Sequence, residues 1–111
     1  VRLSEMYLTR AEANQRNTTS VGSTPLNDVN AIRTRAGLAP LSAVTLADIL
    51  KERRLELAFE HDRFFDLVRT GQAQAAFAAV GKTFVVGKHE VFPLPQKFIN
   101  EAGGLSSQNN Y

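Results

Sequence analysis

Apolar side chains recur every three or four positions at the start of the chain, a spacing that predicts an amphipathic helix over 3–16. The expected apolar stripe of this helix has Arg10 inside it and consists of Leu3, Met6, Tyr7, Ala13 and Asn14. Residues 17–23 are mostly polar and predict a loop. The first helix is therefore expected to face the core with this stripe.

A second helix is expected to begin at Pro25, because proline tolerates the first helical position and Thr24 can cap the free N–H groups there. Gly37 is expected to end it in a left-handed conformation, with Pro40 preventing its continuation. Two helices within about 35 residues approach the length of one tetratricopeptide unit, although one pair does not establish a repeat array. The apolar face of this second helix consists of Leu26, Val29, Ile32 and Ala36.

The third predicted helix opens with Thr45 and Asp48, which resemble a capping box with Asp in place of Glu, and continues through about residue 60. Leu55 and Phe59 fall opposite its main apolar stripe. We therefore expect this helix to be covered on both faces and to be the central element of the fold. Its main stripe consists of Leu46, Ile49, Leu50 and Leu57.

The second half of the chain predicts shorter elements. Helices are expected over 63–70 and 72–80, ended by Gly71 and Gly81. Short strands at 84–86 and 90–92 are expected to form a β-hairpin around Gly87-Lys88, and Pro95 is expected to begin one helical turn. Residues 103–111 are expected to be an irregular tail held by Leu105 and Tyr111. The predicted fold is thus mainly α, with tetratricopeptide-like helix pairs, a short β-hairpin and an irregular C-terminal tail.

Composition places the chain among ordinary globular sequences. With 111 residues, 43% hydrophobic and 22% charged, it predicts one domain or part of one. It begins inside a helical pattern without an initiator methionine, so we expect residues 1–111 to be a fragment of a longer protein. The net charge of +2 comes from dispersed arginines, which argues against nucleic-acid binding. The absence of cysteine excludes disulfides and thiolate metal sites, and no apolar run reaches the ~18 residues of a membrane span.

The densest group of charged residues lies in the second half of the third predicted helix and directly after it. Arg53 falls inside an apolar stripe, where a buried charge without a partner would cost several kcal/mol. One interpretation is a paired-carboxylate active site, as in glycoside hydrolysis. We favour a structural ion-pair network, because alternating opposite charges neutralise each other, whereas an acid catalyst needs a raised pKa. The network is predicted to consist of Arg53, Arg54, Glu56, Glu60, Arg63 and Asp66.

Other candidate chemistry is sparse. His61-Asp62 suggests a metal-dependent hydrolase, but His89 is the one other histidine and further ligands would be needed. No Ser-His-Asp arrangement, phosphate loop or dinucleotide fingerprint is present. Phe64-Phe65 could stack on sugars but is more typical of core packing. The sequence therefore predicts no catalytic residue, no metal site and no cofactor.

Several segments, in order, resemble the C-terminal region of the SusD/RagB family. The most specific spans 49–69 and reads E-R-R-x-E-L-A-F-E followed by R-x-x-D-L-x-R. Residues 3–13 are similar to the family's L-x-E-x-Y-L-x-R-A-E-A helix, and 30–38 to its N-x-I-R-x-R-A-G-L helix end. Residues 91–96 and 108–111 resemble the F-P-I-P segment and the closing Q-N-P-G-Y. Among the departures, Phe64 stands where Trp is common, and the tail lacks the Pro-Gly.

The resemblance implies a lipoprotein anchored outside the outer membrane of a Bacteroidota-type cell. It implies a SusC-like TonB-dependent transporter as partner, over which the lipoprotein captures oligosaccharides or peptides without catalysis or cofactor. The family's ligand-contacting aromatics lie mostly before this region, so the resemblance assigns no ligand-binding residue here. Two alternatives come from other classes: a tetratricopeptide-like module that binds protein partners, and an enzyme built on the Glu/Arg/Asp cluster.

Overall fold

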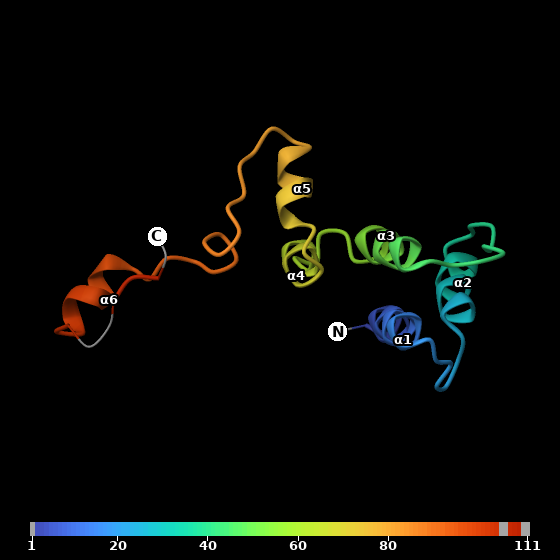
Figure 1. Cartoon of the computed structure of the whole chain (residues 1–111). Coiled ribbons are helices and arrows are strands. Elements are labelled where there is room, and N and C mark those ends of the chain that lie inside the picture. Colours follow the sequence, from blue (N-terminus) through green and yellow to red (C-terminus); the bar gives the residue numbers. More distant parts are fainter. Residues whose placement is uncertain (1, 105–106, 110–111) are drawn as a thin grey trace. The chain divides into compact units, whose positions relative to one another are not determined.

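The structure is a computed structural model that describes residues 2–104 and 107–109. Contacts divide the chain into two compact units, Val1–Arg63 and Phe64–Tyr111. Helix is the one regular structure that the described residues form, which confirms a mainly helical fold and contradicts the predicted hairpin (Figure 1). The helices are α1 (Leu3–Asn17), α2 (Pro25–Arg35), α3 (Leu46–Glu56), α4 (Arg63–Arg69), α5 (Ala73–Ala78) and α6 (Gln96–Glu101).

The core of the first unit lies among its three helices, with α1 in contact with both α2 and α3. Tyr7, Leu41 and Val44 pack around its edge. Burying each large aliphatic side chain contributes roughly 1.5–3 kcal/mol, so this small cluster is a main source of the unit's stability. The buried apolar residues are Leu8, Ala11, Val29, Ile32 and Ile49.

The face of α1 that enters this core is not the predicted one. Leu3 and Met6 are 70% and 47% exposed, and Ala13 is exposed as well. The stripe prediction was wrong for these three positions, whereas Asn14 of the same stripe is buried and Tyr7 is partly buried. The observed buried face follows helical spacing but combines apolar with polar or small residues: Ser4, Leu8, Ala11, Glu12 and Asn14.

The predicted ends of α2 are confirmed. The Thr24 side chain accepts a hydrogen bond from the Asn27 N–H at 3.1 Å, and Pro25 is the first helical residue. At the other end the Leu38 N–H donates to Arg33 O at 2.8 Å and the Gly37 N–H to Thr34 O at 3.0 Å. These two bonds form a Schellman motif, which requires the left-handed conformation that Gly37 adopts at φ +74°.

Helix α3 begins as predicted but ends early. Thr45 and Asp48 form the reciprocal capping box, and hydrogen bonds from the Thr45 hydroxyl and N–H lower the pKa of Asp48. The helix ends at Glu56 rather than near residue 60, and Phe59 has a left-handed φ of +68°. Leu55 is 58% and Phe59 99% exposed, so the expectation that both faces are covered was wrong.

The second unit contains a smaller core built from aromatic and aliphatic side chains. Leu67, Ala73 and Phe84 are buried, and Phe64 and Phe77 pack against them. The Phe77 and Phe84 ring centroids lie 5.3 Å apart, a separation typical of favourable aromatic pairs. Helices α4 and α5 end in turns of the type seen at the end of α2. The Gln72 N–H donates to Leu67 O and the Lys82 N–H to Phe77 O, in each case five residues back.

Residues 84–92 adopt an irregular turn instead of the predicted β-hairpin. The Lys88 and His89 N–H groups both donate to Val85 O, at 3.2 and 3.0 Å. The Val85 N–H donates to His89 Nδ1 at 3.0 Å, and the Gly87 N–H donates to the Glu90 carboxylate at 2.8 Å. These local bonds occupy backbone groups that a ladder would need, which overrides the strand propensity of the valines.

The C-terminal segment is fastened to the Pro-rich segment by side-chain amides. Gln108 forms two hydrogen bonds with the backbone of Leu94, accepting from its N–H at 2.8 Å and donating to its carbonyl at 3.0 Å. Asn109 donates to Phe92 O at 2.7 Å. The predicted contacts of Leu105 and Tyr111 lie outside the described residues. Helix α6 begins after Pro95, as predicted.

Candidate functional site

Glu56 lies at the centre of a cluster of charges at the end of α3. Its carboxylate pairs with Arg35 at 2.5 Å and with Arg2 at 3.3 Å. Arg2 also donates to the backbone carbonyl of Glu56 at 2.7 Å and pairs with Glu60 at 2.5 Å. Arg2 therefore satisfies a carbonyl at the helix C-terminus, where positive charge is favoured, and ties the start of α1 to the end of α3.

The surroundings of Glu56 favour the ionised form of its carboxyl group. Burial alone would raise the pKa of Glu56, but interactions with Ser4 and Arg35 and the charges of Arg35 and Arg2 outweigh it and lower the pKa. The Ser4 hydroxyl is buried and makes no hydrogen bond that meets ordinary distance and angle limits. A carboxyl group with a lowered pKa is a poor general acid at neutral pH.

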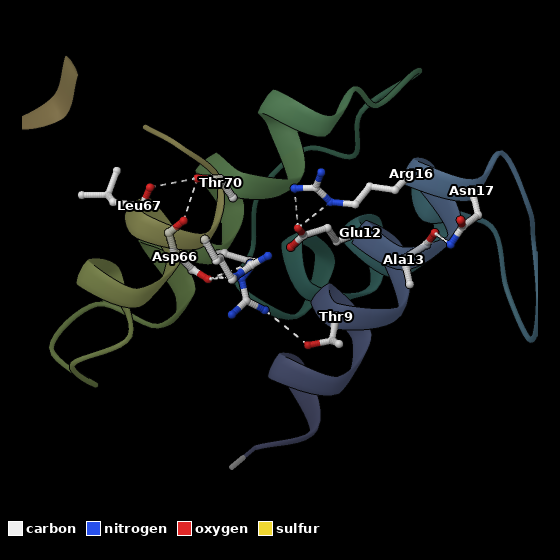
Figure 2. Close-up of polar contacts among 10 residues, drawn as sticks. Thr9, Glu12, Ala13, Arg16, Asn17, Asp66, Leu67 and Thr70 are labelled. Carbon is white, nitrogen blue, oxygen red and sulfur yellow. Dashed lines mark hydrogen bonds and ion pairs between the residues drawn. The ribbon is translucent and has the colours of Figure 1, made fainter. Parts of the chain in front are cut away.

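A second layer of charge joins α2 to the middle of α3. Arg33 pairs with the buried Glu52 at 3.1 Å and donates to Ala39 O at 3.0 Å. Arg53 is buried, as predicted from its place in the stripe, and donates to Thr9 Oγ1 at 3.4 Å. Its neighbour Arg54 is exposed. Figure 2 shows Thr9 on α1 together with Glu12 and Arg16, which pair at 2.8 Å one turn apart.

The structure thus places the predicted network residues as follows. Glu56 and Glu60 share Arg2, and in the second unit Asp66 is buried and accepts two bonds from Arg69, at 2.9 and 2.7 Å (Figure 2). Arg63 is partly buried at the start of α4. Sequence reasoning missed Arg2 and Arg35, because their partners lie 54 and 21 residues away and no local spacing reveals them.

Sequence reasoning also missed the ion pair between Arg10 on α1 and Asp28 on α2. Arg10 bonds both oxygens of Asp28 at 2.9 and 2.7 Å, in the two-point geometry that arginine and carboxylate favour. Asp28 is almost completely buried, and the Arg10 guanidinium also lies over the Tyr7 ring, 5.4 Å from its centroid. The Arg10–Asp28 pair thus connects α1 to α2. One signal in the sequence points to this pair, since Arg10 falls inside the expected apolar stripe of the first helix.

Asn14 organises the loop between α1 and α2. Its amide nitrogen donates to Val21 O and Ser23 O at 3.1 and 2.9 Å, and its oxygen accepts from Thr19 and from the Val21 N–H. All four hydrogen-bonding capacities of the amide are therefore used. Gly22 passes close to Arg10, and a Cβ there would approach the guanidinium to 3.0 Å. The loop is thus shaped from inside by residues of α1.

These arrangements consist of ion pairs and hydrogen bonds that join helices of the described chain. Among the described residues, no three His, Asp or Glu side chains are grouped so as to hold a metal ion. His61 is exposed in the connection after α3, at a left-handed φ of +66°. Within residues 2–104 and 107–109, no helix is long and apolar enough to cross a membrane.

The aromatic candidates separate into two kinds. Phe64 packs against the core of the second unit and lies near Phe84 and Phe92, with centroid distances of 6.5 and 6.4 Å. This position fits the core interpretation of Phe64. Phe65 and Phe92 are largely exposed, so their rings are accessible in the described chain.

A small apolar pocket opens between the first turn of α1 and the last turn of α2. Its volume is about 80 Å³. Pockets that hold small molecules measure about 300–1,000 Å³, so this one is too small for a sugar ring or a cofactor. Its lining residues are Leu3, Ser4, Tyr7, Ala31, Ile32 and Arg35.

The described residues form a mainly helical chain in which ion pairs join the helices. In a comparison with known proteins, the model of the SusD family matches residues 1–111. The chain belongs to the SusD family.

Relatives and solved structures support this membership over the full length of the chain. The starch-binding protein SusD of Bacteroides thetaiotaomicron is 31% identical over 99% of this chain, which spans 21% of that protein. The structure of the surface glycan-binding protein A of the same species matches with a TM-score of 0.86 and 35% identity. The match covers 97% of this chain and 23% of the chain of that protein. The structure of a laminarin binding SusD-like protein matches with a TM-score of 0.80 and 41% identity. The match covers 99% of this chain and 22% of the chain of that protein.

Proposed function

We propose that residues 1–111 are the C-terminal region of a longer, non-catalytic protein that binds oligosaccharides at the cell surface. The observation that carries the proposal is the match to the surface glycan-binding protein A over 97% of this chain at 35% identity. The site supports it, because the carboxylates here are paired with arginines rather than poised for proton transfer. The proposed protein is a lipid-anchored outer-membrane component that works with a SusC-like TonB-dependent transporter.

Within that protein we assign this chain a supporting role. Its buried charges join helices to one another, and the pocket between α1 and α2 is too small for a sugar ring. Oligosaccharide contacts are therefore expected mainly in the part of the protein that precedes this region. A tetratricopeptide-like module that binds only protein partners is the competing proposal, and the α1–α2 pair is compatible with both.

The test is a binding measurement on the protein encoded by the complete reading frame. Purified protein is titrated calorimetrically with laminari-, malto- and xylo-oligosaccharides, and each mixture is then analysed for new reducing ends. We expect saturable binding to one class and no hydrolysis. The appearance of new reducing ends would contradict the non-catalytic role and indicate an enzyme. Binding to none of the sugars, together with capture of peptides, would remove the oligosaccharide proposal.

The transporter partnership has a separate test. The protein is isolated from outer membranes in mild detergent and the co-purifying proteins are identified by mass spectrometry. A TonB-dependent transporter in stoichiometric amount is the expected result. A complex with soluble helical partners and no transporter would favour the tetratricopeptide-like alternative.

A further inference from the structure

The irregular turn of the second unit is closed by hydrogen bonds to two side chains that can take up a proton. The Val85 N–H donates to His89 Nδ1 at 3.0 Å, and the Gly87 N–H donates to the Glu90 carboxylate at 2.8 Å. The Lys88 and His89 N–H groups add two bonds to Val85 O. The conformation of this turn therefore depends on the protonation state of an imidazole and of a carboxyl group.

The bond from Val85 defines the state of the His89 ring. A backbone N–H can only donate, so Nδ1 presents its lone pair and the proton of the neutral imidazole is on Nε2. A protonated imidazole has N–H groups at both nitrogens and no acceptor. Proton uptake at Nδ1 would place two hydrogen atoms between nitrogens that are 3.0 Å apart. The closed turn is therefore incompatible with a protonated ring in this position.

The ring of His89 also packs against the core of the second unit. It meets the Phe84 ring edge to face, with centroids 5.7 Å apart and an interplanar angle of 80°. Phe84 is buried and lies against Phe64 of α4 and Phe77 of α5. An aromatic ring attracts a cation, but this attraction leaves the two N–H hydrogens in conflict. A change at His89 is therefore felt directly beside a buried core residue.

Two charged residues, Lys88 and Glu90, flank His89 in the turn. Helix α5 has no charged residue. The charged residues of α4 are Arg63, Asp66 and Arg69. A carboxyl group ordinarily takes up its proton about two pH units below an imidazole. An opening of the turn near neutral pH would therefore belong to the imidazole, and an opening in more acidic solution to a carboxyl group.

We propose that protonation of His89 opens this turn, which makes residues 84–92 a pH-sensitive segment of the protein. The open turn accepts the proton and the closed turn excludes it, so closure is favoured at higher pH and is lost as the pH falls. Imidazoles change charge between about pH 5 and pH 8, and the opening falls in that window. The inference does not depend on oligosaccharide binding.

The experiment uses the complete protein labelled with ¹⁵N-valine and ¹⁵N-histidine. Exchange of the Val85 amide with water is measured by NMR at about pH 7.5 and about pH 5.5. Each rate is divided by that of an unstructured peptide at the same pH, which removes the intrinsic pH dependence. We expect protection to fall about three- to tenfold at the lower pH, the effect of one hydrogen bond. Unchanged or increased protection would overturn the proposal, as would a neutral His89 ring with its proton on Nδ1.

Two variants of His89 identify the acceptor. His89→Phe keeps an aromatic ring beside Phe84 and removes the acceptor, so Val85 protection is expected to be low at both pH values. His89→Asn replaces Nδ1 by an amide oxygen that accepts an N–H without titrating, so protection is expected to be the same at both pH values. Wild-type pH dependence in either variant would assign the response to another group and overturn the proposal.

The matched control is His61→Asn. His61 is exposed at a left-handed φ of +66°, a conformation that asparagine tolerates. This variant and Glu90→Gln, which keeps an acceptor for the Gly87 N–H, are both expected to retain the wild-type response of Val85. Loss of the response in His61→Asn or in Glu90→Gln would place the sensor at that residue and overturn the assignment to His89.

Discussion

The two compact units of this chain are held together by different physical means. In Val1–Arg63 the helices have 11–15 residues, and ion pairs such as Arg10–Asp28 and Arg33–Glu52 join them over a shared aliphatic core. In Phe64–Tyr111 the helices have only 6–7 residues, and aromatic packing and single side-chain-to-backbone bonds hold irregular segments. Helices this short are unstable in isolation, so the second unit depends more on specific tertiary contacts.

This difference predicts how far the destabilising effect of a substitution spreads within each unit. A cavity in the first unit should loosen three helices together, because α1 contacts both others. Loss of one contact in the second unit should release a single segment.

The largest effect is expected for Ile49→Ala. Ile49 is fully buried in the core shared by α1, α2 and α3, and removing a buried aliphatic side chain of this size costs about 2–5 kcal/mol. Urea unfolding followed by circular dichroism should show a strongly lowered midpoint. Hydrogen exchange should accelerate in all three helices. Acceleration confined to α3 would contradict the cooperative picture of the first unit. Val21→Ala, in the exposed loop, is the control.

A somewhat smaller effect is expected for Arg53→Ala compared with Arg54→Ala. Arg53 is buried among the helices and bonds Thr9, whereas the adjacent Arg54 is exposed on the same helix. Removing Arg53 is expected to lower the free energy of unfolding by about 2 kcal/mol or more, well beyond the ~1 kcal/mol of an average substitution. Arg54→Ala should change it by less than about 0.5 kcal/mol. Equal urea midpoints for the two variants would show that the interactions of Arg53 do not stabilise the fold.

In the second unit, Gln108→Ala is expected to act locally. The variant loses both hydrogen bonds to Leu94, each worth about 0.5–1.5 kcal/mol net. The Leu94 amide should exchange with solvent much faster, while amides of α1 and α3 keep their rates. Gln96→Ala, which removes only a bond to the exposed Asn100 side chain, is the control. A global loss of stability would show that the units are not energetically distinct.

The smallest effect is expected from pH, through Glu56. Its folded-state pKa is lowered below the ordinary 4.5, so the unfolded state binds more protons in that window. Stability from this group is therefore fully present above the ordinary value and is lost as pH falls through the lowered pKa. In Glu56→Gln the unfolding free energy should depend less steeply on pH below about 4.5. Identical pH profiles for the wild-type protein and Glu56→Gln would contradict the stabilisation of ionised Glu56 by Arg2 and Arg35.

Local signals in the sequence predicted the ends of elements well. Thr24, Pro25, Gly37 and the Thr45/Asp48 box were all assigned their observed roles. These signals act through hydrogen bonds and steric limits within a few residues, so neighbouring positions contain the information. The early end of α3 was missed, because Arg2, far away in the sequence, satisfies the carbonyl of Glu56.

The candidate site was only partly predictable. Burial of Arg53 and of Asp66 agrees with the interpretation of these charges as structural. The partners of Glu56 and Asp28 could not be read from spacing, since they come from other helices. The hairpin at 84–92 was predicted from valine and phenylalanine propensity, but His89 and Glu90 accept backbone N–H bonds that favour a turn.

The sequence by itself determined that the chain is mainly helical, where α2 begins and ends, where α1 and α3 begin, and to which family the chain belongs. Only the tertiary structure decided which face of α1 is buried, since Leu8 and Ala11 enter the core while Leu3 and Met6 stay outside. The physical reason is that capping depends on adjacent residues, whereas the choice between two apolar faces depends on which distant helix offers the better contact.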